Sequence, residues 1–215
     1  IKGAYSIITL IHGIGLVAFR DPNGIRPLSL GRRQTSKGEE WAFASEDVAF
    51  ATIGFEKVRD VEPGEGILID MEGRMHSVQC APGKLTPCIF EYVYLARPDS
   101  MLDKISVYKF QLRLGQALAK QIQAANLEID TVIPVPDSSR HAALELANEI
   151  GVKYREGLVK NRYVGRTFIQ PTQTGRQSAV SKKHSPNRAV LEGKRVILVD
   201  DSIVRGNTSK KIVQM

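Results

Sequence analysis

Two adjacent carboxylates near the end of the sequence are the residues best suited to chemistry. Asp200 and Asp201 follow an apolar run, 196–199, and precede a Gly-Asn-Thr-Ser loop at 206–209. In open α/β sheets ligands bind at the carboxyl ends of strands, and small and hydroxyl residues at the start of a helix bind anions. Carboxylates suit sugar hydroxyls or Mg²⁺ rather than bare phosphate. The stretch therefore predicts a ligand with a phosphate at one end and a diol or metal at the other, such as a phosphorylated ribose.

An exposed turn is the alternative interpretation of the same residues. Asp200 and Asp201 would then be solvated, and Thr208 or Ser209 would cap a helix. The order of buried strand, carboxylates, small-residue loop and helix favours the binding site.

The elements that must position these residues follow from the spacing of apolar side chains. Apolar residues recur at three- and four-residue steps over 107–122, which predicts an amphipathic helix. The run 131–136 reads as a buried strand that leads into 137–139, three good N-cap residues, and a second helix follows. The continuous apolar run 195–199 is typical of a parallel strand covered on both faces. Strand, helix and strand in alternation predict an open α/β sheet.

The first 86 residues have the pattern of an antiparallel sheet. Short apolar runs at 7–10 and 16–19 flank His-Gly-Ile-Gly, which predicts a hairpin. Asp-Pro-Asn-Gly at 21–24 is a strong turn signal. We place a domain boundary after Ala-Pro-Gly at 81–83.

One motif is discounted. Gly13 to Ala18 matches the dinucleotide fingerprint G-x-G-x-x-A, whose mechanism requires a helix to open there. The turn at 21–24 breaks the chain within a few residues, so the hairpin is the better interpretation. The sequence contains no G-x-x-x-x-G-K-[ST], which excludes a P-loop.

Composition bounds the class of protein. The 215 residues are 42% hydrophobic and carry a net charge of +7, which fits a globular protein rather than a disordered one. No apolar run approaches the roughly 18 residues needed to cross a bilayer. Two cysteines are too few for a disulfide scaffold and fit a reducing, cytoplasmic compartment. The basic balance allows a nucleic-acid partner or a phosphate-rich small substrate.

Residues 196–209 resemble the phosphoribosylpyrophosphate (PRPP) motif of type I phosphoribosyltransferases. The wider chain resembles the glutamine-dependent PRPP amidotransferase family. Further matches occur in family order: to the later part of its N-terminal-nucleophile glutaminase domain (19–28, 44–46), its domain junction (90–100) and its flexible active-site loop (160–169).

The resemblance implies an α/β fold in two parts. Residues 1–86 would be the C-terminal part of an N-terminal-nucleophile (αββα) glutaminase domain. Residues 87–215 would be part of a type I phosphoribosyltransferase domain, with a Rossmann-like parallel sheet. The implied reaction is displacement of pyrophosphate from PRPP by glutamine-derived ammonia, giving 5-phosphoribosylamine in the first committed step of de novo purine biosynthesis. The implied partners are PRPP, glutamine, Mg²⁺ and further copies of the chain, without nucleic acid or membrane.

Roles follow from the resemblance for individual residues. Asp200 and Asp201 would contact the ribose hydroxyls and help to hold Mg²⁺, and Ser138, in the pyrophosphate loop, would contribute to the metal site. The family usually has Thr where this chain has Asn207, so we expect weaker or re-aimed phosphate contact. The full set implied to bind substrate is Asp137, Ser138, Ser139, Asp200, Asp201, Ser202, Gly206, Asn207, Thr208 and Ser209. The loop that would close over PRPP supplies Lys160, Arg162, Tyr163 and Arg166.

The sequence departs from the family in two places. It begins at Ile1 rather than at the family's nucleophilic N-terminal cysteine, so we expect an internal fragment without glutaminase activity of its own, whose transferase domain continues past Met215. Cys88 matches a position that ligates an iron–sulfur cluster in some members. A small buried side chain is the alternative for Cys88.

Three other functions were weighed. A PRPP-sensing regulator that binds DNA would explain the basic balance, but it predicts a helix-turn-helix module where 1–86 shows hairpins. Another glutaminase-domain enzyme would leave 200–209 unexplained. A non-catalytic relative has only Asn207 in its favour. The charge itself is local: residues 153–195 hold 11 Lys and Arg against two acidic residues, where an anionic substrate would need them.

Overall fold

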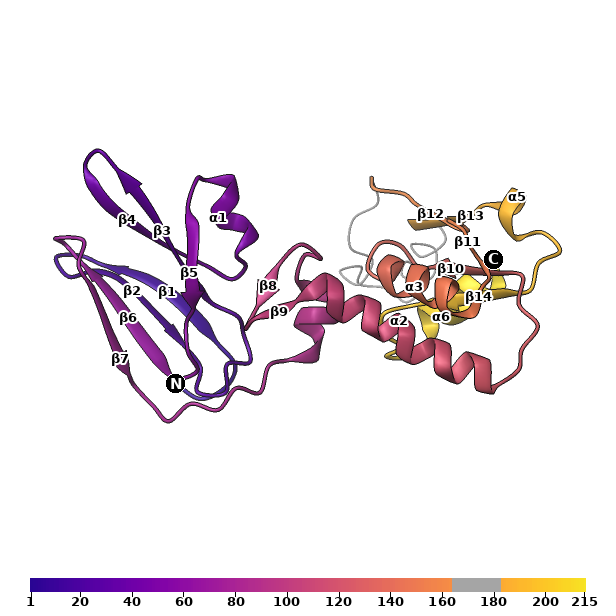
Figure 1. The fold of residues 1–215 in the computed structure, drawn as a ribbon, viewed down its shortest axis with the longest axis horizontal. Coiled ribbons are helices and arrows are strands. Elements are labelled where there is room, and N and C mark those ends of the chain that lie inside the picture. The colour runs from indigo at the N-terminus through magenta and orange to yellow at the C-terminus, as the bar shows by residue number, and fades with distance from the viewer. Residues whose placement is uncertain (164–182) are drawn as a thin grey trace. The chain divides into compact units, whose positions relative to one another are not determined.

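The computed structural model describes residues 1–163 and 183–215. Two compact units divide the chain, Ile1–Phe110 (unit 1) and Gln111–Met215 (unit 2). Figure 1 shows the helices and strands of each unit.

Unit 1 contains two larger antiparallel sheets and the antiparallel pair β8-β9, and the antiparallel pairing within 1–86 is as the hairpin pattern predicted. One of the larger sheets has the strand order β1-β2-β6-β7 and the other the order β4-β3-β5. The strands are β1 (Ser6–Ile11), β2 (Gly15–Arg20), β3 (Ser29–Thr35), β4 (Gly38–Ala44), β5 (Glu56–Asp60), β6 (Glu65–Asp70) and β7 (Met75–Gln79), with a short helix α1 (Val48–Thr52) before β5. The discounted G-x-G-x-x-A motif lies in the β1–β2 hairpin, where Ile11 pairs with Gly15, so the hairpin interpretation is confirmed.

A buried ion pair extends unit 1 beyond the predicted boundary at 81–83. The Arg20 guanidinium lies 2.8 Å from both carboxylate oxygens of Asp103 and also donates to the carbonyl oxygens of Val61 and Gly24. Asp103 lies in the turn between β8 (Met101–Leu102) and β9 (Ile105–Ser106), which follow the short π-helix η1 (Glu91–Leu95). A buried guanidinium needs such a partner, which fixes this turn to the core of unit 1. The division of 1–86 from 87–215 concerns family domains and stays a prediction.

Unit 2 is built on a parallel sheet of order β11-β10-β14, which confirms the predicted α/β arrangement. Its elements are α2 (Val107–Ala124, which starts in unit 1), β10 (Thr131–Pro134), α3 (Arg140–Ile150), β11 (Lys153–Tyr154), β12 (Leu158–Lys160), β13 (His184–Pro186), α5 (Arg188–Leu191), β14 (Val196–Val199) and α6 (Asn207–Gln214). Alternate residues of β10 enter two clusters: Val132 packs with α2 and α3, whereas Ile133 packs with Ile212 of α6 and Leu158 of β12. The sheet is therefore covered on both faces (Figure 1).

The apolar run of β14 is less buried than its sequence predicts. Val199 is buried, but Val196, Ile197 and Leu198 are only half-buried. Among the described residues β14 pairs with β10 alone and so forms one edge of the sheet. Within 1–163 and 183–215, no helix combines the length and the apolar character needed to cross a membrane.

The predicted amphipathic helix is confirmed as α2, and a glycine of this helix lies against the backbone of α3. A Cβ added at Gly115 would lie 2.5 Å from the carbonyl oxygen of Ala142 and 3.0 Å from the amide nitrogen of Leu146. Glycine in mid-helix normally destabilises. Here it lets α2 and α3 approach more closely than any side chain would allow.

We predict that Gly115→Ala destabilises unit 2, although alanine is the better helix former. Overpacking against backbone atoms costs about 1–3 kcal/mol, which outweighs the roughly 1 kcal/mol gained in helix propensity. Urea unfolding measures the difference, with the exposed Lys120→Ala as a control expected to change stability by less than about 0.5 kcal/mol. A Gly115→Ala protein more stable than the parent would contradict the close contact.

Candidate functional site

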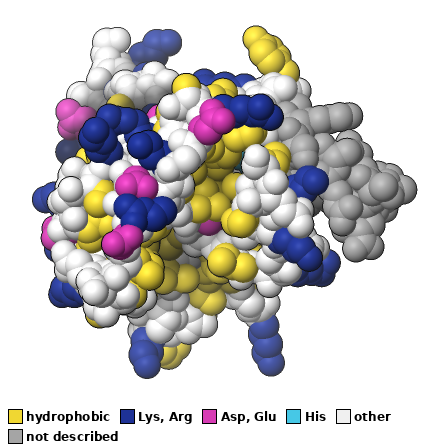
Figure 2. Space-filling view, turned by 90° about the vertical axis from the view of Figure 1, so that its right-hand side faces the viewer, with side chains coloured by type: hydrophobic (Ala, Val, Ile, Leu, Met, Phe, Trp, Pro, Cys, Tyr) yellow, Lys and Arg dark blue, Asp and Glu magenta, His cyan; other side chains and the backbone are white. Residues whose placement is uncertain are grey.

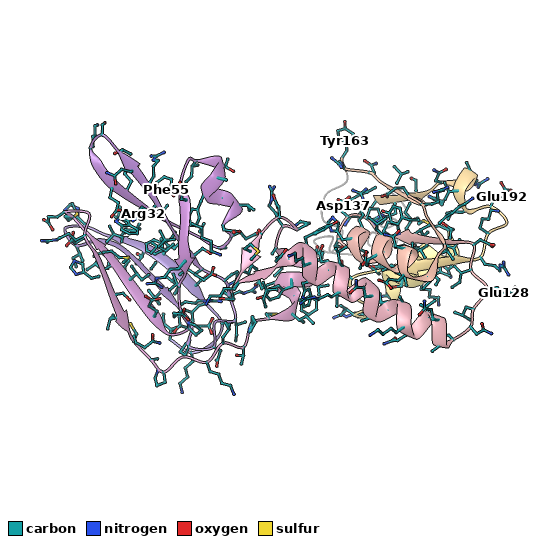
Figure 3. All side chains as sticks on the ribbon, viewed as in Figure 1. Arg32, Phe55, Glu128, Asp137, Tyr163 and Glu192 are labelled. Atoms are coloured by element: carbon teal, nitrogen blue, oxygen red, sulfur yellow. The ribbon has the colours of Figure 1, made fainter. Side chains whose placement is uncertain are left out.

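The carboxyl ends of β10 and β14 lie side by side. The two strands pair in parallel from Thr131 with Val196 to Pro134 with Val199, and the amide of Val135 extends the pairing by donating to the carbonyl of Val199 at 2.8 Å. The loops that follow, 137–139 and 200–202, therefore leave the sheet at the same edge. Figure 3 shows Asp137 at this end of unit 2, with Glu128 and Glu192, which precede β10 and β14, at the other end.

Ser138 and Asp201 join the two loops directly. The Ser138 hydroxyl donates to Oδ2 of Asp201, and the Ser202 hydroxyl donates to Oδ1 of the same carboxylate at 2.6 Å. The Asp200 carboxylate accepts a 2.9 Å hydrogen bond from the amide of Asp201. Burial, with the negative charge of Asp201 as the second cause, raises the pKa of Asp200. A cation beside this carboxylate would counteract the rise in its pKa, because it favours the ionised form.

The donor set fits Mg²⁺ that is shared with a ligand. Asp200, Asp201 and Ser138 offer hard oxygen atoms, and Mg²⁺ typically takes one or two carboxylates together with substrate phosphates. Among the described residues, no group of three or more His, Cys, Asp or Glu side chains could hold a metal ion. A magnesium ion here would depend on oxygens that the ligand brings.

The Asp137 carboxylate is held by two cations. Lys160 donates to its Oδ2, and Nη1 of Arg140 lies 3.3 Å from its Oδ1. Burial would raise the pKa of Asp137, but the hydrogen bond and charge of Lys160, helped by Arg140 and Arg162, lower it overall. The predicted loop residue Lys160 therefore lies at the site, in contact with the loop that follows β10.

The three residues predicted as N-caps lie at the start of α3, and one of them, Ser139, is its N-cap. The Ser139 side chain makes no capping bond. The side chains of Ser138 and Asp137 contact Asp201 and Lys160. The Ser139 hydroxyl is buried, at 2% exposure, and has no hydrogen-bond partner within the described chain. Buried polar atoms are nearly always satisfied, so this hydroxyl indicates a partner that the described residues do not supply.

At α6 the N-cap is Gly206 rather than Thr208 or Ser209. Its φ of +69° lies in the left-handed region, which explains the glycine. The side chains of Asn207 and Thr208 are exposed, and Ser209 is half-buried. The first turn of α6, with its polar side chains, is thus open to an anion.

Of the remaining predicted loop residues, Arg162 and Tyr163 are described, and neither contacts Asp200 or Asp201, although the charge of Arg162 helps to lower the pKa of Asp137. Tyr163 is fully exposed, and its amide donates to the side chain of Asn161 at 3.0 Å. Arg162 is exposed, and Arg166 lies outside the described residues.

What the sequence did not predict is a set of contacts around Arg140: its Nε lies 3.4 Å from Oε1 of Glu156. The one sequence signal was a cation at the first position of a helix, where the macrodipole disfavours it.

The described basic residues of 153–195 do not all lie at the site. Arg195 pairs with Glu128 and Asp130 at the opposite end of the strands. Figure 2 looks onto unit 2 from that opposite end and shows Lys and Arg side chains spread over the face, with apolar and acidic side chains between them. Part of the charge therefore serves other contacts.

The chain's cysteines do not make an iron–sulfur site by themselves. Cys80 is exposed and Cys88 is half-buried, and the sequence has no others. Fe–S clusters are commonly held by four thiolates. A ligand role for Cys88 stays a prediction.

Comparisons with known proteins match these features. Residues 108–215 match the family described as "Phosphoribosyl transferase domain". The chain is similar to curated amidophosphoribosyltransferases: 54% identical to that of Pseudomonas aeruginosa over 99% of its length, and 52% and 50% identical to those of Escherichia coli and Saccharomyces cerevisiae over its whole length. It spans 43% of each of these three relatives.

Two solved structures are similar over the whole chain. One is described as a glutamine PRPP amidotransferase from B. subtilis complexed with ADP and GMP, with 46% identity and a TM-score of 0.83. The other is described as the allosteric regulatory enzyme of purine biosynthesis, with 46% identity and a TM-score of 0.84. The chain covers 45% and 44% of these two chains.

We predict a pH-dependent stability effect at Asp200. Because its folded pKa is raised above the ordinary 3.8, Asp200 contributes stability that is complete below that value and is lost as pH rises through the folded pKa. Asp200→Asn cannot ionise, so its advantage in melting temperature over the parent should grow from about pH 4 to about pH 7.

Asp130→Asn is the matched control, with the opposite sign. Arg195 lowers the pKa of Asp130, so this variant should be less stable than the parent near neutral pH and should approach it in acid. If the melting temperatures of the Asp200→Asn protein and the parent differed by the same amount across this pH range, the raised pKa of Asp200 would be contradicted.

Proposed function

The chain belongs to the phosphoribosyl transferase domain family, and we propose that it binds PRPP as part of an amidophosphoribosyltransferase. The observation that supports this proposal best is the Ser138–Asp201 hydrogen bond, because it unites the predicted pyrophosphate loop with the predicted ribose-binding carboxylates. The similarity to amidophosphoribosyltransferases along the whole chain supports the choice among PRPP-binding enzymes.

Each part of PRPP has a counterpart at the edge of the sheet. The 5′-phosphate would lie at the first turn of α6, where 206–209 provides amide and hydroxyl donors. The ribose hydroxyls would face Asp200 and Asp201. The pyrophosphate would lie against 137–139, where the unpartnered hydroxyl of Ser139 is available to donate to it.

The proposed reaction is attack of ammonia on C1 of PRPP with departure of pyrophosphate. Negative charge grows on the leaving group, so the residues around it must neutralise charge rather than act as bases. Lys160 is placed for this work beside Asp137. Mg²⁺ held by Asp200, Asp201 and Ser138 would act as a Lewis acid and a template for the ligand. Loop 160–169 would exclude water, which competes with ammonia as the nucleophile.

Glutamine hydrolysis is proposed for the whole protein rather than for this chain. The chain spans less than half the length of the relatives that it matches. We assign 1–86 to a glutaminase domain of the N-terminal-nucleophile kind. Its two antiparallel sheets are compatible with the ββ layers of that fold. We also propose that the whole protein is a cytoplasmic homo-oligomer. A weaker phosphate contact at Asn207 also remains part of the proposal.

We predict that Asp200→Ala combined with Asp201→Ala abolishes PRPP-dependent formation of phosphoribosylamine in the full-length protein. Both ribose contacts and both carboxylate ligands for Mg²⁺ would be lost, so the rate should fall by at least about 1000-fold. Glutamine hydrolysis should stay measurable. Coupled assays of phosphoribosylamine and of glutamate measure the two activities separately.

The control removes two carboxylates from the opposite end of the strands. Glu128→Ala combined with Glu192→Ala makes the same change in net charge and should keep the rate within about twofold, because exposed ion pairs contribute little. Unchanged phosphoribosylamine formation in the Asp200→Ala, Asp201→Ala protein would rule out the proposed role of this edge.

A further inference from the structure

A chain of contacts leads from β11 to the loop that follows β10. The Tyr154 hydroxyl donates to Oε1 of Glu156 at 2.6 Å, and Nε of Arg140 lies 3.4 Å from that same oxygen. Nη1 of Arg140 lies 3.3 Å from Oδ1 of Asp137. The Arg140 guanidinium is therefore fixed between two carboxylates.

A cation at this position destabilises the helix unless nearby negative charges compensate it. Arg140 is the first residue of α3, and the positive end of a helix macrodipole disfavours a cation. Asp137 and Glu156 offset that cost, but neither takes the full donor capacity of the guanidinium. Nε is buried and makes no hydrogen bond within the described chain, and both ion-pair distances exceed the 2.7–2.9 Å of a strong charge-assisted bond.

An anion is the partner that the surroundings of Arg140 favour. The preceding residue is Ser139, whose buried hydroxyl also has no partner within the described chain. The first turn of α3 adds the positive end of its macrodipole. Two under-used donors therefore belong to consecutive residues at the N-terminus of α3, after the carboxyl end of β10.

We propose that Arg140 binds the pyrophosphate end of PRPP, and that Glu156 is the positioning residue that holds its guanidinium ready. The proposal rests on the proposed function and adds a residue to it. A planar guanidinium matches two oxygens of a phosphate group. Arg140 takes up the phosphate oxygens with its Nη atoms while Glu156, held by Tyr154, keeps Nε in place. Asp137 gives up its share of Arg140 and remains paired with Lys160.

Isothermal titration of inorganic pyrophosphate into the full-length protein, with Mg²⁺ present, tests the contact. Arg140→Ala should weaken pyrophosphate binding by about tenfold, since a hydrogen-bonded charge is lost from a half-exposed site. Arg140→Lys should recover only part of that loss, because it keeps the charge but not the planar fork. Ribose 5-phosphate, which lacks pyrophosphate, should bind all variants equally.

Arg155→Ala is the matched control for a general charge effect. Arg155 is an exposed arginine in the same part of unit 2, and its guanidinium donates to the carbonyl of Tyr154. This variant should bind pyrophosphate within about twofold of the parent. Equal losses for Arg155→Ala and Arg140→Ala would overturn the proposal in favour of general electrostatics.

Glu156→Gln tests the positioning role. It should raise KM for PRPP by about threefold with kcat unchanged, and it should add nothing in the Arg140→Ala background, because its effect acts through Arg140. Additive losses would contradict the positioning role. If the parent binds pyrophosphate and Arg140→Ala binds it as tightly, this inference fails alone. If the parent binds neither pyrophosphate nor ribose 5-phosphate, the proposed function fails with it.

Discussion

The parallel pairing of β10 with β14 is the constraint on which the candidate site depends. The strands are far apart in the sequence, yet their register brings Pro134 opposite Val199. The segments that follow the two strands therefore leave the sheet at the same edge. One side-chain hydrogen bond, from Ser138 to Asp201, then joins the two loops. A shift of register by one residue would turn alternate side chains to the other face and separate these groups.

Charge at this edge is balanced before any ligand arrives. Asp137 is shared by Lys160 and Arg140, and Glu156 compensates Arg140 on its other side. The carboxylate of Asp200 differs, because burial and the neighbouring Asp201 raise its pKa. An anionic ligand that arrives with a divalent cation would suit both groups of residues: the cation would offset the charge of Asp200, and the phosphates would take over Arg140 from Asp137. This pattern fits a Mg²⁺-bound polyphosphate better than a free sugar or a free metal ion.

Sequence periodicity was enough to predict the parallel strands, α2, the β1–β2 hairpin and the edge where Asp200 and Asp201 lie. Each of these depends on local patterns of apolar residues and turn residues. The local capping preference correctly placed Ser139 at the start of α3. The contacts of Ser138 and Asp137, with partners 63 and 23 residues away, could not be predicted from a local pattern. The contact between Arg140 and Glu156 depends on packing around α3 and likewise could not be predicted from the sequence. The buried pair of Arg20 with Asp103, 83 residues apart, likewise explains why unit 1 continues to Phe110.

The central claim is that one edge of the sheet binds both ends of a single ligand. Phosphorus NMR of PRPP tests it directly, because the 5′-phosphate and the pyrophosphate give separate resonances. With the full-length protein and Mg²⁺, the account predicts that both sets of resonances shift or broaden together and saturate at one ligand per chain. It also predicts that chelation of Mg²⁺ reverses the change. Resonances that stay unchanged, or a change confined to one end of PRPP, would contradict a site that joins 137–139 to 200–209.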